Sequence, residues 1–125
     1  MKTISLTLPW PPSVNHYYGR SKSGNVYLKE AGRMYRKNAA VEFARLGWPR
    51  IDGFVRVDII ASPPDRRRRD IDNIRKAAYD AISDRKGHTG VIADDVHIQA
   101  DSAVMAEPGE GVIHISITSL GKERL

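Results

Sequence analysis

The sequence contains no cysteine among its 125 residues and has only two tryptophans and two phenylalanines. The absence of cysteine excludes a disulfide framework, a thiolate metal site and a cysteine nucleophile, and it fits a reducing compartment such as the cytoplasm. No run of about 18 apolar residues is present, so we expect no membrane span. Residues 1–5 alternate without the apolar stretch of a signal peptide. The length fits a single domain over residues 1–125.

The balance of charge is basic. Twenty lysine and arginine residues exceed fifteen aspartate and glutamate residues, which gives a formal net charge of +5 and a pI of about 9.7. A basic protein suits a polyanionic partner such as DNA. Many basic proteins bind no nucleic acid, however, so the positions of the charges are more informative than their sum.

Hydrophobic periodicity predicts the secondary structure. Alternating patterns indicate strands at residues 2–8, 54–60, 96–106 and 112–118, and repeats of three to four residues indicate helices at 28–46 and 71–84. The order β-α-β-α-β-β predicts an α+β fold in which two helices pack on a single mixed sheet. Residues 107–111 form so short a turn that an antiparallel hairpin is expected between the last two strands.

The apolar residues of these elements define the expected core, since each element must bury one face. Asp70 directly precedes the second helix and is its candidate N-cap. A polar loop, long enough to be functional or mobile, is expected between the first strand and the first helix. The expected core residues are Ile4, Leu6, Leu8, Ala31, Tyr35, Ala39, Phe43, Leu46, Ile71, Ile74, Ala78, Ile82, Ile113, Ile115 and Ile117.

The most informative segment is residues 65–76, where three acids, Asp65, Asp70 and Asp72, lie among six bases. A hard cation such as Mg²⁺ takes oxygen ligands, commonly one or two carboxylates with waters and substrate phosphate. The surrounding arginines would hold the phosphates of a nucleic acid. The segment therefore indicates a divalent cation beside a phosphodiester.

Helix geometry allows the carboxylates of this segment to meet. Asp72 and Lys76 are four residues apart and share a helix face. Asp70 and Asp72 can converge if Asp70 lies in the loop and Asp72 in the first turn, where the helix dipole favours their charge. Asp94 and Asp95 precede an expected strand, and since neighbouring side chains of a strand point to opposite faces, only one of them is expected to reach the same site.

Each of these features also has an ordinary structural explanation. An Asp-x-Asp pair is usually a turn or a helix cap, and a run of four arginines is usually a solvated surface. An Asp-Asp pair in a loop is usually turn chemistry, and Asp72 with Lys76 could be a helix ion pair. Their co-occurrence within residues 65–95 of a basic chain favours a metallonuclease.

Other chemistries find less support. The four histidines do not form a zinc-binding spacing, and no phosphate-cradling glycine loop or Gly-x-Ser-x-Gly elbow is present. Trp10, Tyr17, Tyr18 and Tyr27 could stack on bases, or they could pack in the core or the loop.

The residues just described resemble the RusA family of Holliday junction resolvases, known from bacteria and their prophages. The resemblance covers nearly the whole chain. It includes Leu8-Pro9-Trp10-Pro11-Pro12-Ser13 with Asn15 and Tyr17-Tyr18, the segment from Pro64 to Asn73 with Lys76-Ala77-Ala78, and Asp94-Asp95 before a strand. The middle block is long and unusual in composition, which makes it highly specific.

The resemblance implies a homodimer that binds branched DNA, a four-way junction, and nicks two strands symmetrically with Mg²⁺, for which Mn²⁺ could substitute. It places the catalytic, metal-binding aspartates at Asp70, Asp72 and Asp95, a catalytic lysine at Lys76 and a junction-contacting arginine at Arg69. The expected DNA-binding residues are Arg66, Arg67, Arg68, Arg69 and Arg75. Residues 83–90 are longer and more polar than the family's usual link, which leaves substrate choice open. Two alternatives remain: a nuclease for flaps or other branched DNA, and a DNA-binding protein that does not cleave.

Overall fold

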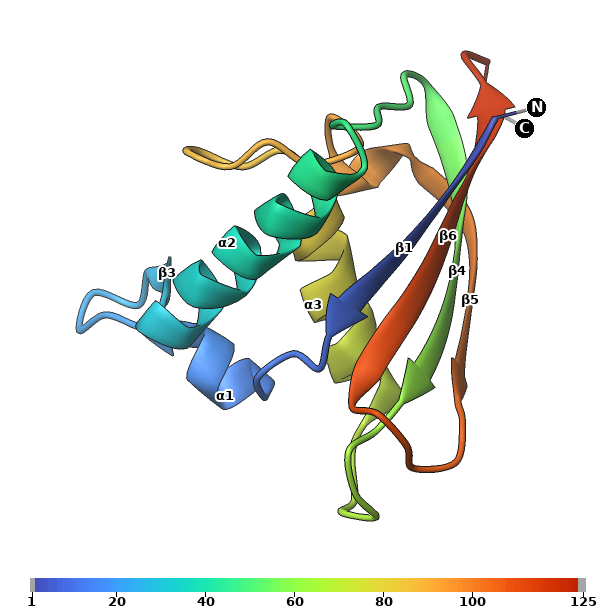
Figure 1. Cartoon of the computed structure of the whole chain (residues 1–125). Helices are drawn as coiled ribbons and strands as arrows, with labels where there is room; N and C mark the ends of the chain where they lie inside the picture. The colour runs from blue at the N-terminus through green and yellow to red at the C-terminus, as the bar shows by residue number, and fades with distance from the viewer. Residues whose placement is uncertain (1, 124–125) are drawn as a thin grey trace.

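The computed structural model describes residues 2–123 and consists of a twisted sheet with helices on one side (Figure 1). The chain order is β-α-β-β-α-β-α-3₁₀-β-β. The elements are β1 (Thr3–Pro9), α1 (Val14–Tyr17), β2 (Tyr18–Arg20), β3 (Val26–Leu28), α2 (Glu30–Arg45), β4 (Phe54–Ser62), α3 (Ile71–Ile82), a 3₁₀ helix (Asp95–His97), β5 (Ile98–Met105) and β6 (Val112–Gly121). The predicted α+β class with a mixed sheet is confirmed.

The main sheet has the strand order β1-β6-β4-β5. β6 runs antiparallel to both β1 and β4, whereas β5 runs parallel to β4. The connection from β4 to β5 contains α3, as a parallel pair requires. The predicted hairpin between the last two strands is therefore wrong, because β4 lies between β5 and β6. The short link crosses the end of β4 instead, where Ala106 and Gly109 donate backbone hydrogen bonds to Ala61 and Pro63.

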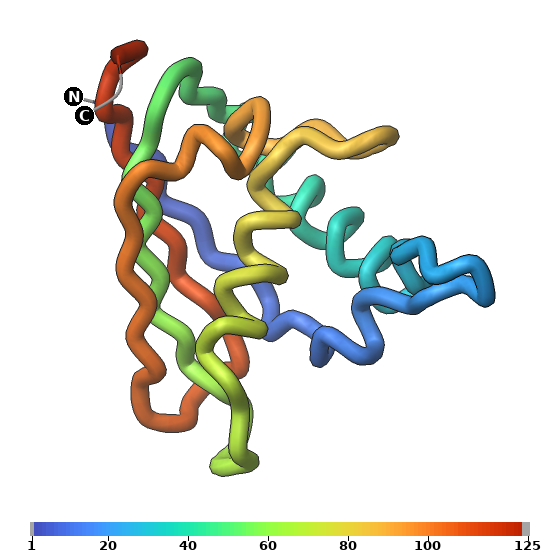
Figure 2. The backbone as a smooth tube through the Cα atoms, turned by 180° about the vertical axis from the view of Figure 1, so that it is seen from behind, coloured from blue at the N-terminus to red at the C-terminus, as the bar shows by residue number. Residues whose placement is uncertain are grey.

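α2 and α3 cover one face of this sheet (Figures 1 and 2). The alternation of β1 and β6 is confirmed, since Ile4, Leu6 and Leu8 are buried and the residues between them are exposed. Of the expected helix stripes, Ala31 and Leu46 are exposed and Ile71 is half-buried. The buried stripe of α2 begins at Gly32 rather than at Ala31 and ends at Phe43. The other expected core residues are buried.

The expected polar loop contains structure that periodicity did not reveal. α1 and the two-stranded sheet of β2 and β3 occupy residues 14–28. Tyr17 is 1% exposed and belongs to the core, whereas Tyr27 is 50% exposed. Elements of three and four residues are too short to give a periodic signal, which is why the sequence indicated only a loop.

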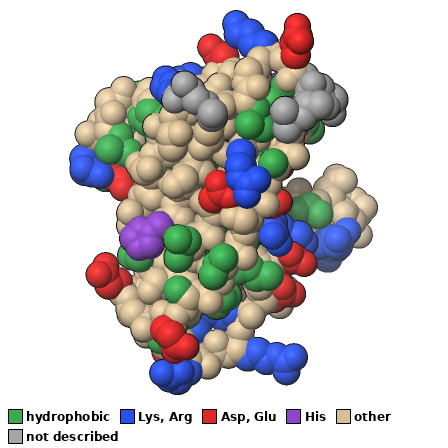
Figure 3. Space-filling model, turned by 90° about the vertical axis from the view of Figure 1, so that its right-hand side faces the viewer, with side chains coloured by type: hydrophobic (Ala, Val, Ile, Leu, Met, Phe, Trp, Pro, Cys, Tyr) green, Lys and Arg blue, Asp and Glu red, His purple; other side chains and the backbone are tan. Residues whose placement is uncertain are grey.

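The outer face of the sheet carries mixed side chains (Figure 3). Arg56 and Asp58 form an ion pair of 3.0 Å there, and Ile60 and Val104 are exposed neighbours. Among the described residues, the helices are all too short or too polar to cross a membrane.

Candidate active site and DNA interface

The N-terminus of α3 presents two carboxylates. Asp70 has an extended backbone and caps the helix, because its Oδ1 accepts a hydrogen bond of 3.0 Å from the backbone N–H of Asp72. The predicted N-cap is thus confirmed. No other partner contacts the Asp70 carboxylate among residues 2–123, so its second oxygen faces solvent at the positive end of the helix dipole.

Asp72 lies in the first turn of α3, and its side chain is 70% exposed. Its Oδ1 accepts a hydrogen bond of 2.8 Å from Arg75. The helix ion pair considered from the sequence forms with Arg75 rather than with Lys76. Lys76 is exposed, and within the described part of the chain its ammonium makes no ion pair. One oxygen of Asp72 and the ammonium of Lys76 are therefore not engaged by other side chains of the described residues.

Asp94 and Asp95 have different roles in the fold. Asp94 caps the 3₁₀ helix, since its Oδ1 accepts a hydrogen bond of 3.0 Å from the Val96 backbone, and this bond lowers the pKa of the Asp94 carboxyl. Asp95 is the first residue of the 3₁₀ helix and lies 3.4 Å from Arg85. The expected strand starts at Ile98 rather than at residue 96, because the 3₁₀ turn precedes it.

Asp95 lies nearer the C-terminal end of α3, in a cleft that Tyr79 and Asp101 also line, whereas Asp70 and Asp72 lie at its N-terminus. Its partner Arg85 follows the last residue of α3, Ile82, whereas Asp70 precedes the first. A helix of 12 residues separates its ends by about 16 Å. Among residues 2–123 no group of three histidine, cysteine, aspartate or glutamate side chains could hold a metal ion. One chain alone does not bring the three expected ligands together.

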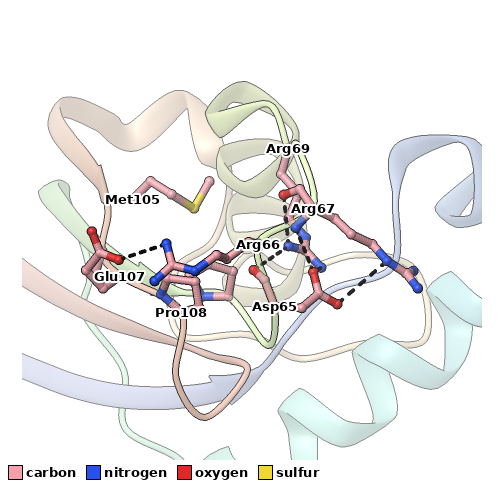
Figure 4. Close-up of a pocket in the computed structure, with 9 residues that line it drawn as sticks. Asp65, Arg66, Arg67, Arg69, Met105, Glu107 and Pro108 are labelled. Atoms are coloured by element: carbon pink, nitrogen blue, oxygen red, sulfur yellow. Dashed lines mark hydrogen bonds and ion pairs between the residues drawn. The ribbon is translucent and has the colours of Figure 1, made fainter.

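The arginine run forms the loop between β4 and α3. It lies beside the link from β5 to β6, at the end of the sheet where α3 begins (Figure 1). Arg66 and Arg67 have side chains that are 81% and 86% exposed. A cleft of about 220 Å³ lies between this loop and the link from β5 to β6 (Figure 4). Glu107 of the link pairs with Arg66 at 3.4 Å. Solvent-facing guanidinium groups of this kind are suited to phosphate contacts.

Arg69 is held more firmly than the other arginines. Its side chain is 18% exposed, pairs with Asp65 at 2.8 Å and lies over the ring of Trp10 at 5.2 Å. A second cleft of about 420 Å³ follows directly, and Arg69, Asp70 and Trp10 line it together with Asn73. The arginine loop thus continues without a break into the carboxylates of α3.

Arg75 was also expected to contact DNA. In the structure it lies between Asp72 at 2.8 Å and Asp101 of β5 at 2.7 Å, and its side chain is 30% exposed. Two of its donors are therefore already engaged by carboxylates.

A buried charged group behind the site was not expected from the sequence. Asp80 of α3 is 3% exposed and accepts hydrogen bonds from Tyr17, from Arg36 at 2.7 and 2.9 Å, and from Arg85 at 3.1 Å. Burial raises the pKa of Asp80, but the bonds from Arg36 and Tyr17 outweigh burial and hold it below its ordinary value. The sequence did contain a signal for this buried acid, because Asp80 lies among the apolar residues of the inner side of α3.

An arginine loop that runs into carboxylates at a helix N-terminus suits a protein that acts on nucleic-acid phosphates, and the comparisons define the class as a DNA endonuclease. The family model described as Endodeoxyribonuclease RusA matches residues 9–118. The chain belongs to the RusA family.

Three relatives illustrate the similarity. The chain is 38% identical over 132 residues to proteins named crossover junction endodeoxyribonuclease RusA from Shigella sonnei (strain Ss046) and Escherichia coli (strain K12). It is 36% identical over 131 residues to the protein of the same name from Enterobacteria phage 82. Each alignment covers 98% of this chain and 100% of the relative.

Proposed function

We propose that this protein resolves four-way DNA junctions by hydrolysing phosphodiester bonds in paired, symmetric nicks, in a reaction that requires Mg²⁺ and for which Mn²⁺ can substitute. The observation that carries the proposal is the continuity of the exposed arginine loop with Asp70 and Asp72 at the start of α3. The names of the relatives supply the junction as substrate.

The side chains at the start of α3 fit a divalent cation. Asp70 and Asp72 each have one carboxylate oxygen engaged and one free within the described chain. Carboxylate oxygens are the ligands that Mg²⁺ prefers, and it is usually held by one or two of them with waters and phosphate. When bound, the cation would supply an activated water and a polarised phosphate.

The remaining residues bind and orient the substrate. Arg66, Arg67, Arg68 and Arg69 would neutralise phosphates, so loss of any one contact should reduce the slope of log affinity against log salt by about 0.9. Lys76 is one turn beyond Asp72, and its free ammonium would stabilise the negative charge that gathers on the phosphate in the transition state.

A homodimer explains two further points. Paired nicks need two equivalent sites, and a two-fold dimer provides them on a substrate that has its own two-fold symmetry. Since Asp95 is separated from Asp70 and Asp72 within one chain, we propose that Asp95 of one protomer completes the site of its partner.

The direct test compares an immobile four-way junction with a linear duplex of matched sequence, each with and without Mg²⁺. We expect cleavage only of the junction and only with the cation. Asp72→Asn is the matched control, and it should bind the junction without cutting it, because removing negative charge beside DNA does not weaken phosphate attraction. Equal cutting of a flap substrate would favour the broader nuclease, and binding without any cutting would favour a non-cleaving protein.

A further inference from the structure

Arg75 is held on two sides by carboxylates. Its Nε donates a hydrogen bond of 2.7 Å to Oδ2 of Asp101, and its Nη1 donates one of 2.8 Å to Oδ1 of Asp72. The hydroxyl of Tyr79 donates to the same oxygen of Asp101. A candidate metal ligand is thus linked through one arginine to an acid that the metal proposal does not use.

The two acids differ in how firmly they are fixed. Asp101 belongs to β5 and pairs with Val57 in the register of the sheet, and its side chain is 33% exposed. Asp72 is 70% exposed at the end of a helix, where a short side chain would otherwise sample several rotamers. Because the fork of a guanidinium is rigid and planar, the orientation of Asp101 is passed on to Asp72.

Charge also argues for a fixed arrangement. Asp72, Arg75 and Asp101 together carry two negative charges and one positive charge, so the group retains one negative charge for a cation. An arginine guanidinium is not deprotonated in proteins, so Arg75 always supplies the positive charge of this group. Two of the five N–H donors of Arg75 are engaged by these carboxylates, so a phosphate would compete with them for a forked contact.

From this geometry we infer that Arg75 is a positioning residue for Asp72: anchored by Asp101 and Tyr79, it fixes Oδ1 of Asp72 and leaves Oδ2 for the divalent cation, without contacting DNA phosphate. The inference deepens the proposed function and depends on it. It also gives Arg75 a different role from Arg66 to Arg69, whose guanidinium groups lie on the loop.

The experiment separates cation binding from DNA binding. Mn²⁺ is titrated into the purified protein without DNA, and the loss of the free-ion signal in electron paramagnetic resonance measures the dissociation constant. Junction affinity and its salt slope are measured separately in EDTA. The variants are Arg75→Gln, Arg75→Lys, Asp101→Asn and Tyr79→Phe. Arg56→Gln and Asp58→Asn are matched controls, since this pair is similarly exposed on the outer face of the sheet.

We expect Arg75→Gln to weaken Mn²⁺ binding about tenfold, as is usual when a group that orients a metal ligand is removed. Asp101→Asn and Tyr79→Phe should weaken it less, because each releases only one anchor, and Arg75→Lys should restore part of the loss. Junction affinity and salt slope should stay at the wild-type values in every variant, and the controls should change neither quantity.

Two results would overturn the inference. A lower junction affinity for Arg75→Gln with a salt slope reduced by about 0.9 would assign Arg75 to the DNA interface, and Asp101→Asn should then strengthen DNA binding. Unchanged Mn²⁺ binding in all four variants would reduce the group to a surface ion pair. Failure of the proposed function is recognised separately, because the wild-type protein would then neither bind Mn²⁺ nor cut the junction. Far-ultraviolet circular dichroism and melting temperature identify any variant that does not fold.

Discussion

At the scale of single residues, the neighbouring acids Asp94 and Asp95 make different hydrogen bonds and ion pairs. The carboxylate of Asp94 is occupied by the Val96 backbone at 3.0 Å, which makes it a helix cap. Asp95 is 45% exposed and pairs with Arg85 at 3.4 Å. The cap engages only one oxygen of Asp94, as the cap of α3 does for Asp70, so the choice of Asp95 as the metal ligand rests on the family resemblance.

We therefore predict that Asp95→Asn abolishes junction cleavage and that Asp94→Asn retains most of it. Asparagine caps a helix about as well as aspartate, so Asp94→Asn should also keep the stability of the wild-type protein. Asp94→Ala should lose about 1 kcal/mol, the usual cost of a missing cap. Initial cleavage rates at saturating Mg²⁺ and thermal melts of the same preparations measure both quantities, and the reverse ranking of the two asparagine variants would exchange the roles of the two acids.

At the scale of elements, α3 joins the chemistry to the core. Its N-terminus carries Asp70 and Asp72, and its inner side carries Asp80, to which α1, α2 and the loop after α3 are attached through Tyr17, Arg36 and Arg85. Since Arg85 also contacts Asp95, the position of that acid depends on the buried group.

Removing the Asp80 charge should therefore destabilise the whole fold. We predict that Asp80→Asn costs about 3–5 kcal/mol, because it leaves the partly buried Arg36 without a counter-ion and Arg85 with Asp95 alone. Glu30→Gln is the matched control, because it breaks an exposed ion pair with Arg33. The side chains of Arg33 and Glu30 are 54% and 75% exposed, so the loss should be less than about 1 kcal/mol. Urea unfolding followed by circular dichroism measures both, and equal losses would contradict the importance of burial.

Asp80 also makes the free energy of unfolding depend on pH. The pKa of Asp80 is lower in the folded protein than its ordinary value, so the folded state binds this proton less readily than the unfolded state. Its contribution to stability is present above the ordinary aspartate pKa of about 4 and is lost as pH falls through the lower folded value. The gap in unfolding free energy between wild type and Asp80→Asn should hence be constant near neutral pH and should narrow below about pH 4.

What the sequence could predict depended on whether a residue's environment is set locally. The strands β1 and β6 and the buried stripe of α3 were predictable, because burial of one face imposes a period on the sequence. The Asp70 cap was predictable from its position alone. The order of β5 and β6 was not, since a short link does not reveal that β4 lies between them. Asp80 was missed because its partners come from three distant segments.

At the scale of the whole molecule, the three aspartates expected to bind the metal do not form one group within the described part of a single chain. Asp70 and Asp72 lie beside the arginine loop, whereas Asp95 lies nearer the C-terminal end of α3, in a cleft with Tyr79 and Asp101. No described group of three such side chains is close enough for a metal ion. A site shared between two protomers reconciles this separation with the ligand set that the family resemblance implies.

A mixture of two inactive variants distinguishes a shared site from a site within one chain. In a dimer of one Asp72→Asn chain and one Asp95→Asn chain, a shared arrangement leaves one site intact, because the Asp95→Asn chain supplies Asp70 and Asp72 and the other chain supplies Asp95. A site within one chain leaves none. Refolding the two variants together should thus restore about a quarter of the wild-type sites, since half of the dimers are mixed and each has one good site. These dimers should nick only one strand of each junction, so nicked junctions should accumulate in place of resolved duplexes. Each variant refolded alone should stay inactive, which controls for contaminating nuclease. If the mixture also stays inactive while size-exclusion chromatography with a tagged partner confirms mixed dimers, the three aspartates do not act together across the interface.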